Sequence, residues 1–307
     1  MKIINVPPNA RWTLMGVTVA RDLNGPHGLC VIDDDDNSKQ TTIIIADSYN
    51  HRIVQYKTGN TTNGQIIAGD NGQGDQLNQL NSPIDVLYDK ETDNLIIADW
   101  GNRRVLRWSR RSGTKQGEIL IDNIKCHGLF LNDQRNLYCT VTEKQEIRRY
   151  QLDQIGEDKK GTLVAGGNGN GANLNQLNWP TYIFIDRHQN VYVSDNGNHR
   201  VMKWNKDARG GIVVAGGHAY GNAVKQLYHP NGLFVDTSGT LYVVDFYNNR
   251  VMRWTQGAQE GTIVVGGNGE GAGANQFSYP TSLSIDRHGN LYVVDRENKR
   301  VQQFTLA

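Results

Sequence analysis

Two histidines and one asparagine are the residues of this chain whose types and spacing could do chemistry. His27 and His127 both stand in the tripeptide HGL, and Asn231 likewise precedes a glycine and a leucine. Neutral imidazoles bind zinc, copper or nickel, and three converging ligands with an open fourth position suit a catalytic metal. The three residues therefore form a candidate site for zinc or another ligand. Alternatively, the histidines line a water-filled channel and hydrogen-bond to backbone groups.

Calcium is a second candidate metal, because an asparagine combined with backbone carbonyls suits that ion. Asp85 is the nearest acidic candidate, and no acidic cluster clearly supports it. The acidic run IDDDD at 32–36 is expected at the opposite end of the fold from the histidines. We interpret that run as a solvated turn.

A glycine- and asparagine-rich stretch raises phosphate binding as a further possibility. AGGNGNGANLNQLNWP occupies 165–180, and related stretches begin at Ala68, Ala215 and Val265. Every copy lacks the Lys-Ser/Thr ending of a P-loop and the helix that should follow a dinucleotide-binding loop. We therefore interpret the stretch as a structural loop whose glycines supply positive φ angles.

A second recurring segment defines the period of the chain. ADSYNHRIVQY, ADWGNRRVLRW, SDNGNHRVMKW, VDFYNNRVMRW and VDRENKRVQQF place aspartates at 47, 99, 195, 245 and 295, and Val141 takes the same position in a weaker copy. Intervals of 42 to 54 residues indicate a propeller or solenoid. Each repeat predicts four short strands, for example over 232–236, 241–245, 250–254 and 261–265. The expected fold is an all-β, six-bladed β-propeller of four-stranded antiparallel blades.

The two ends of the chain predict how the ring closes. The last repeat stops after its third strand, and GVTVA at 16–20 matches the missing fourth strand. The N-terminal strand should therefore complete blade six, so that residues 1–307 form one propeller domain. Removal of residues 1–20 should destabilise that whole domain.

Two features of the repeat are interpreted as structural. An aspartate and an arginine five residues later should fasten the turn of each blade. The pairs are Asp47 with Arg52, Asp99 with Arg104, Asp195 with Arg200, Asp245 with Arg250, and Asp295 with Arg300. The aromatic residue that ends each third strand should pack between blades.

The innermost strands show where the copies differ. Their opening residues in blades one to six are His27, Ile84, His127, Thr181, Asn231 and Thr281, followed by Gly28, Asp85, Gly128, Tyr182, Gly232 and Ser282. Odd blades of a six-bladed ring point inward about 120° apart. We therefore expect the two histidines and Asn231 to converge at one mouth of the axial channel.

The segments DxxNxRVxxW and PxGLFVDxxGxLYVVD resemble NHL repeats over nearly the whole chain. The resemblance implies a propeller that serves as a protein-binding or RNA-binding module, and related six-bladed propellers are metal-dependent lyases and hydrolases. Fold alone does not decide between these functions.

The HGL context also resembles, more weakly, peptidyl-hydroxyglycine α-amidating lyases, which hold zinc with histidines from alternate blades. This resemblance implies that Arg296 stands in the place of the catalytic arginine of that family. Asn231 stands where a third histidine is expected, and the turn that should supply the catalytic tyrosine contains Trp100.

The turns between the second and third strands vary from blade to blade and form the predicted binding face. The predicted face residues are Tyr49, Trp100, Arg103, Asn196, Phe246, Tyr247 and Arg296. Our leading hypothesis is a binding module for a protein or small-molecule ligand on this face and at the channel mouth. The alternatives are a metal-dependent lyase or hydrolase at the mouth, and an RNA-binding module that uses the basic stretch NRRVLRWSRRSGTK at 102–115.

The amino-acid composition limits the remaining classes of function and of fold. The net charge is +1, so no global field favours nucleic acid or a membrane surface. Three cysteines without a CxxC pair argue against a disulfide framework, although one bridge stays open. No apolar run suggests a membrane span or a signal peptide. We expect a soluble monomer and leave its compartment open.

Overall fold

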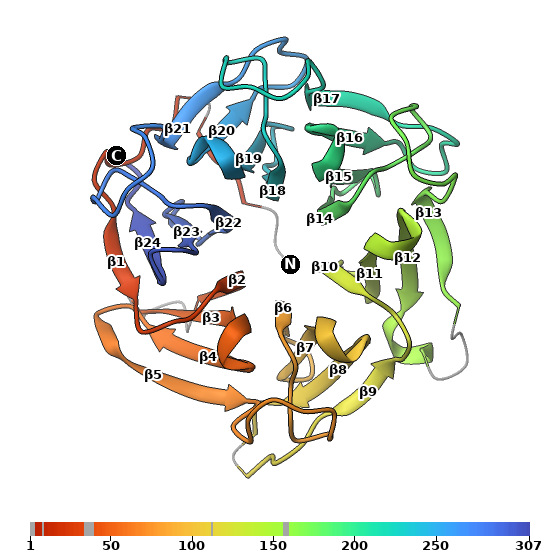
Figure 1. The fold of residues 1–307 in the computed structure, drawn as a ribbon, viewed down its shortest axis with the longest axis vertical. Helices are drawn as coiled ribbons and strands as arrows, with labels where there is room; N and C mark the ends of the chain where they lie inside the picture. The colour runs from red at the N-terminus through yellow and green to blue at the C-terminus, as the bar shows by residue number, and fades with distance from the viewer. Residues whose placement is uncertain (1–3, 8, 34–39, 112, 156–159) are drawn as a thin grey trace.

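The computed structural model describes residues 4–7, 9–33, 40–111, 113–155 and 160–307, which build a ring of six sheets (Figure 1). Each sheet has four antiparallel strands, which follow the chain from the axis outward in blades one to five (Figure 1). In blade six three strands do so, and the outermost strand comes from the N-terminal region. The predicted all-β six-bladed propeller is therefore confirmed. Most of the acidic run, residues 34–36, lies outside the described residues.

The strands of the first three blades run in sequence order. Blade one contains β2 (Pro26–Asp33), β3 (Thr41–Asp47), β4 (Arg52–Lys57) and β5 (Asn60–Ala68). Blade two contains β6 (Pro83–Asp89), β7 (Asn94–Asp99), β8 (Arg104–Ser109) and β9 (Glu118–Ile121). Blade three contains β10 (Cys126–Leu131), β11 (Asn136–Val141), β12 (Glu146–Gln151) and β13 (Thr162–Gly166).

Blades four and five follow the same order, whereas blade six takes its outer strand from the N-terminal region. Blade four contains β14 (Pro180–Ile185), β15 (Val191–Asp195), β16 (Arg200–Trp204) and β17 (Ile212–Gly216). Blade five contains β18 (Pro230–Val235), β19 (Leu241–Asp245), β20 (Arg250–Trp254) and β21 (Thr262–Gly266). Blade six contains β22 (Pro280–Ile285), β23 (Leu291–Asp295), β24 (Arg300–Phe304) and β1 (Val17–Ala20).

Short 3₁₀ turns join the second and third strands of five blades and define what we call the top face. They are η1 (Ser48–Asn50), η2 (Trp100–Asn102), η3 (Thr142–Lys144), η5 (Asn196–Asn198) and η6 (Phe246–Asn248). A further turn, η4 (Leu152–Gln154), follows β12. Among the described residues, no helix has the length and apolar character needed to cross a membrane.

The core lies between the blades because each sheet packs on both of its faces. All seven residues of β3 are buried, and all six of β14. Runs of Val, Ile and Leu therefore replace strict alternation of polar and apolar residues. Phenylalanines continue this packing from blade to blade: Phe184 lies 5.1 Å from Phe130 and 5.6 Å from Phe234 between ring centroids.

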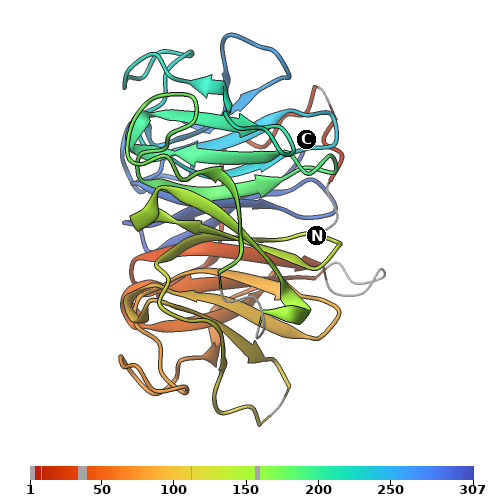
Figure 2. The same ribbon diagram turned by 90° about the vertical axis from the view of Figure 1, so that its right-hand side faces the viewer.

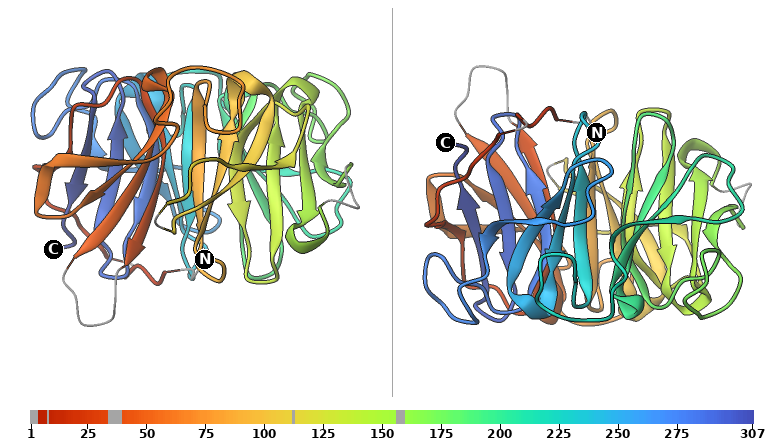
Figure 3. Two further views of the ribbon diagram at one scale, coloured as in Figure 1. Left: turned by 90° about the horizontal axis from the view of Figure 1, so that it is seen from below. Right: turned by 90° about the horizontal axis from the view of Figure 1, so that it is seen from above.

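The N-terminal strand closes the ring as predicted. Val17 pairs with Gln303 and Thr18 with Gln302, so that β1 is the outer strand of blade six. The segment before β1 crosses the bottom face, opposite the 3₁₀ turns, in the side views of Figures 2 and 3. There the indole of Trp12 donates a 2.8 Å hydrogen bond to the carbonyl of Gly289. This segment adds contacts with blades five and six that the sequence did not predict.

The glycine-rich loops are structural, because an arginine side chain organises each of the four from inside. In blade four, the Arg200 guanidinium donates to the carbonyls of Ala172, Asn173 and Gln176. Its Nε donates to Asp195 at 2.7 Å. The loop thus points carbonyl oxygens at a cation, the reverse of the N–H groups that a phosphate site requires.

The Asp–Arg pairs form in all five blades where they were predicted, with N···O distances of 2.7–2.8 Å. Blade three lacks the pair. Val141 replaces the aspartate and Glu146 replaces the arginine, and Glu146 pairs with Arg148 at 2.6 Å. Blade three also has no glycine-rich loop before its inner strand. The turn between its second and third strands is therefore not fastened by an Asp–Arg pair as in the other blades.

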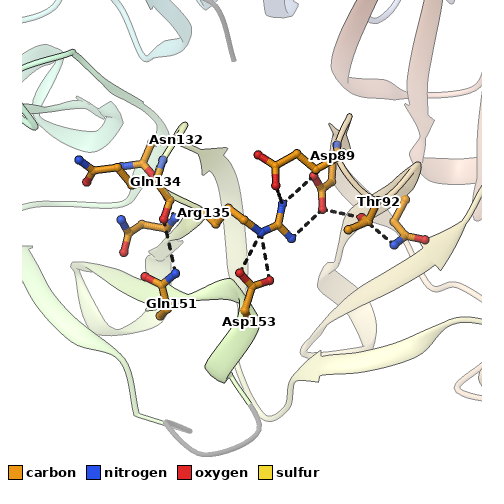
Figure 4. A network of polar contacts seen from close by, with 10 residues as sticks. Asp89, Thr92, Asn132, Gln134, Arg135, Gln151 and Asp153 are labelled. Carbon is orange, nitrogen blue, oxygen red and sulfur yellow. Dashed lines mark hydrogen bonds and ion pairs between the residues drawn. The ribbon is translucent and has the colours of Figure 1, made fainter.

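A polar network joins blades two and three on the bottom face (Figure 4). Arg135 donates to both carboxylate oxygens of Asp89 at 3.1 Å and to both oxygens of Asp153 at 2.9–3.0 Å. Although burial opposes ionisation of Asp89, hydrogen bonds from Arg135 and Thr92 lower the pKa of that carboxyl. The two blades are thereby joined by charge as well as by packing.

Candidate ligand site at the channel mouth

The inner strands place their second residues at the top of the axial channel. In β2, β10 and β18 the first residue pairs with the second strand of the blade, and the register of that pairing then shifts. The next two residues of the inner strand therefore stand outside the regular pairing. The residues concerned are His27, His127 and Asn231, each followed by glycine. The local irregularity of the inner strand is therefore what positions the predicted site.

The glycine after each of these residues is required by the close approach of neighbouring inner strands. A Cβ atom on Gly28 would lie 2.3 Å from an oxygen of Asp85, and one on Gly128 would lie 2.6 Å from the carbonyl of Thr181. On Gly232 it would lie 2.7 Å from the Cα atom of Ser282. The His-Gly and Asn-Gly pairs thus combine a side chain at the mouth with tight packing around the axis.

The structure brings the two histidines together, as the sequence predicted. The imidazole rings of His27 and His127 lie 5.1 Å apart between centroids and meet edge to face. Asn231 occupies the corresponding position of β18, but no described contact joins its side chain to either histidine. Within this predicted set, contact is therefore shown for the two imidazoles.

Tyr182, which the sequence analysis did not propose as a site residue, completes this cluster. Its hydroxyl lies 2.8 Å from Nδ1 of His27, and its ring centroid lies 5.2 Å from that of His127. A signal existed in the sequence, because Tyr182 is the only aromatic residue among the six that occupy its position of the inner strands. Only the folded ring shows that the Tyr182 side chain points toward the histidines.

Two tryptophans and a lysine form one wall of the mouth. The ring of Trp100, on η2, lies 5.7 Å from His127 and 6.4 Å from Trp179. The ammonium group of Lys125 lies over the Trp100 ring at 5.3 Å. Trp179 is 49% exposed, so this wall is open to solvent on its outer side.

Arg296 and Tyr49 form another wall, between blades six and one. The Arg296 guanidinium lies over the Tyr49 ring at 5.3 Å, and its Nη2 donates to the Tyr49 hydroxyl. Glu297 lies 3.6 Å from Nη1. Arg296 also contributes to the lowered pKa of His27, so its charge acts at the mouth.

Three buried polar atoms at the mouth have no hydrogen-bond partner among the described residues: Nδ1 of His127, Oδ1 of Asn231 and Nε of Arg296. His127 is 5% exposed and Asn231 is 6% exposed. A buried polar group without a partner costs about 1–3 kcal/mol. A polar molecule that brings its own donors and acceptors is one way to satisfy such groups.

Burial keeps both imidazoles neutral. It lowers the pKa of His127 to about 3. It also lowers the pKa of His27 well below its usual value, and the neighbouring His127 and Arg296 add to this effect. Burial raises the pKa of Asp85 to about 7, against hydrogen bonds from the N–H groups of Leu129 and Val86. With both imidazoles neutral, the positive charges at the mouth are those of Arg296 and Lys125.

A cavity of about 80 Å³ lies along the channel, lined by residues that follow the mouth residues in the inner strands. Most of its lining is apolar, including Leu29, Leu129, Phe184 and Leu233, and Asp85 and Tyr182 contribute polar groups. The channel thus combines an apolar interior with a polar rim.

The donor set does not fit a catalytic zinc site. Such a site needs three nitrogen, sulfur or carboxylate ligands, and the mouth supplies two imidazoles and an amide. No group of three His, Cys, Asp or Glu side chains suited to a metal is found in the described part of the chain. Both Asp85 oxygens accept backbone N–H groups, from Val86 and Leu129. Zinc and calcium stay predictions.

The other predicted face residues lie on the top face but differ in surroundings. Arg103 is held by Glu143 at 2.7–2.8 Å, and Asn196 donates to the carbonyl of Pro230 at 3.0 Å. The rings of Phe246 and Tyr247 meet edge to face, with 4.9 Å between their centroids.

The basic stretch proposed for RNA is extensively paired. Arg104, Arg107 and Arg110 form ion pairs with Asp99, Glu118 and Asp93, as Arg103 does with Glu143. These contacts reduce the positive charge available to a phosphate backbone. RNA binding stays an untested prediction.

Solved structures share this fold at low sequence identity. A Bacteroides thetaiotaomicron protein of unknown function is 15% identical with a TM-score of 0.69, over 100% of this chain and 75% of that chain. An auxiliary nutrient binding protein from the same organism is also 15% identical, with a TM-score of 0.66 over 99% and 74%. Virginiamycin B lyase from Staphylococcus aureus is 12% identical, with a TM-score of 0.58 over 97% and 100%.

Sequence comparison agrees with the repeat pattern. The comparison with curated proteins gave no match. The family model described as NHL repeat matches residues 227–253 and 277–304, in blades five and six. The chain is therefore a six-bladed β-propeller in which blades five and six match NHL repeats.

Proposed function

We propose that this propeller is a binding module that takes a small polar ligand at the channel mouth. The observation that carries the proposal is the set of three unpartnered atoms on His127, Asn231 and Arg296. A ligand with its own donors and acceptors would satisfy them and recover the free energy that their burial costs. The NHL propeller fold is commonly used for binding, and one solved structure with this fold is described as a nutrient binding protein.

The surroundings narrow the class of ligand. The rings of Trp100, Tyr182 and Tyr49 offer apolar faces, while the neutral imidazoles and the Asn231 amide offer hydrogen bonds. Arg296 adds one positive charge. A compact molecule with a flat apolar part and a few polar groups, one of them anionic, matches this combination.

Ligand-observed NMR with a library of small fragments tests the proposal. We expect fragments, carboxylates among them, to bind the wild-type protein and to lose at least tenfold in affinity with Asn231→Ala or His127→Ala. Thr140→Val is the matched control, because it removes a buried unpartnered atom on the second strand of blade three instead of at the mouth. Absence of binding to the wild type, or equal binding to all variants, would overturn the proposal.

A lyase or hydrolase at the same mouth is the second candidate. The hydrogen bond between His27 and Tyr182 favours it, because such a pair can pass a proton to or from a bound molecule. Virginiamycin B lyase has the same fold, but a sequence identity of 12% indicates nothing about a shared function.

Elemental analysis of the purified protein and of a His27→Ala/His127→Ala variant tests the metal-dependent version. Stoichiometric zinc that is lost in the variant would contradict our interpretation of the donor set and support an enzyme. Wild-type protein that stays free of metal after zinc reconstitution would leave the binding module as the better proposal.

A further inference from the structure

The top of blade five carries a group of aromatic side chains that the channel mouth does not use. We call it the blade-five aromatic surface and define it by Tyr220, Tyr228, His229, Phe246 and Tyr247. The first three belong to the loop between β17 and β18, and the last two to η6. Tyr220 is 62% exposed and Tyr247 is 44% exposed.

The rings of this surface form a continuous chain of contacts. Tyr220 stacks on Tyr228 at 5.0 Å between centroids, and Tyr228 lies 4.7 Å from Tyr247. Tyr247 in turn contacts His229 at 5.2 Å and Phe246 at 4.9 Å. Each ring holds its neighbours in place, so a ligand would meet an ordered platform and would order few side chains on binding.

The repeat itself shows that the fold does not require these rings. Gln73, Asn170 and Glu270 stand at the position of Tyr220, each in the same isolated bridge. Asn81, Asn178 and Ser278 stand at the position of Tyr228, and Gly101, Gly197 and Glu297 at that of Tyr247. Blades with polar residues or glycine at these positions build the same turn, so the aromatic residues of blade five have another role.

The backbone at His229 strengthens this argument. His229 has φ = 54° directly before Pro230, a left-handed conformation that is uncommon for bulky residues. The same conformation occurs at Gly25 and Ser82 in blades one and two, and at Trp179 and Tyr279 in blades four and six. The repeat therefore accepts small and aromatic residues alike at this position, so the turn itself does not require the imidazole of His229.

The surface is uncharged. Burial lowers the pKa of His229, and of the neighbouring His199, so both rings are neutral at physiological pH. In the loop that supplies three of the five side chains, Lys225 is the only residue with a formal charge. Asn196 adds an amide to this surface, because its Oδ1 lies 2.6 Å from Nδ1 of His229.

We propose that the blade-five aromatic surface binds a neutral, linear oligosaccharide. Sugar rings place C–H groups against aromatic faces, while their hydroxyls exchange hydrogen bonds with Tyr hydroxyls, imidazoles and amides. An RNA strand would require a basic groove, which this surface lacks. A stable protein interface engages about 20–30 residues a side, far more than these five rings.

Isothermal titration with cellohexaose, xylohexaose and maltohexaose tests the proposal. We expect at least one of them to bind the wild-type protein, and Tyr220→Asn/Tyr247→Gly to weaken that binding at least tenfold. The two substitutions install the residues that blade four has at these positions, so the variant should fold. Leu174→Asn is the control, because it removes an exposed apolar side chain from the loop of blade four.

Failure of all three sugars to bind, or equal binding by wild type and the double variant, would overturn the proposal. A peptide that binds through the same two tyrosines in place of the sugars would overturn it as well. Fragment binding at the channel mouth should not change in Tyr220→Asn/Tyr247→Gly. The two binding proposals can therefore fail independently.

Discussion

The hydroxyl of Tyr182 lies 2.8 Å from Nδ1 of His27, and this contact crosses the axial channel from blade four to blade one. The two residues are 155 positions apart and belong to opposite blades of the ring. The channel mouth is therefore bridged by a hydrogen bond, with the His127 ring packed against both partners. Interaction across the axis, and not only between neighbouring blades, shapes the candidate site.

The stability losses from removing the two partners of this bridge should not add. Tyr182→Phe leaves Nδ1 of His27 without its partner, and we expect a loss of about 1–2 kcal/mol in the free energy of unfolding. In a His27→Leu/Tyr182→Phe variant the loss should be smaller than the sum of the single losses. Urea denaturation of all four proteins measures the coupling. Strict additivity would mean that the hydrogen bond does not form in solution.

Replacement of Asn231 by leucine should stabilise the protein while it abolishes ligand binding. The amide oxygen is buried without a partner in the described chain, and an apolar side chain of similar size avoids that cost. We expect the midpoint of thermal unfolding to rise by about 2–4 °C. Differential scanning calorimetry checks this. A fall in the midpoint would show that the amide is satisfied and has a structural role.

Asp85 should make stability fall as the pH rises. Its folded pKa of about 7 lies above the 3.8 of an ordinary aspartate, so between these values the folded state binds a proton that the unfolded state has released. The free energy of unfolding should then decrease by up to about 1.4 kcal/mol for each pH unit. The contribution is fully present at low pH and is lost as the pH rises through 7.

Asp85→Asn should remove this dependence. The difference in unfolding free energy between wild type and variant, measured in urea from pH 5 to 7.5, should shift steadily in favour of the variant. A difference that is constant over this range would contradict the raised pKa of Asp85.

Arg200 should matter more to stability than Arg52, although both pair with the aspartate of their blade. Arg200 also binds three carbonyls of a glycine-rich loop, which blade one lacks, while the partner carboxylates Asp195 and Asp47 are both fully buried. Arg200→Ala leaves the Asp195 carboxylate unpaired, at a cost of about 3–5 kcal/mol. Arg52→Ala should cost less, because the Arg52 side chain is 27% exposed. Equal losses in chemical denaturation would show that the loop contacts contribute nothing.

Much of the fold could be predicted from the sequence because it rests on local patterns that repeat. The recurring Asp–Arg spacing, the runs of Val, Ile and Tyr, and the missing last strand depend on neighbours within one blade, and the structure confirms the six blades, the ion pairs and the closure by β1. The same logic correctly separated the glycine-rich loops from phosphate-binding loops.

Tertiary structure decided which side chains share the mouth. The alignment of inner strands placed His27 and His127 at equivalent positions, but the distance across the ring depends on side-chain lengths and on how far each strand leans toward the axis. Those factors brought Tyr182 to His27 and left the Asn231 oxygen without a hydrogen-bond partner among the residues that the structure describes. The pairing of Arg103 with Glu143 across two blades was equally invisible in the sequence. Spacing along the chain determines which blade a residue joins, whereas contact between blades depends on the shape of the closed ring.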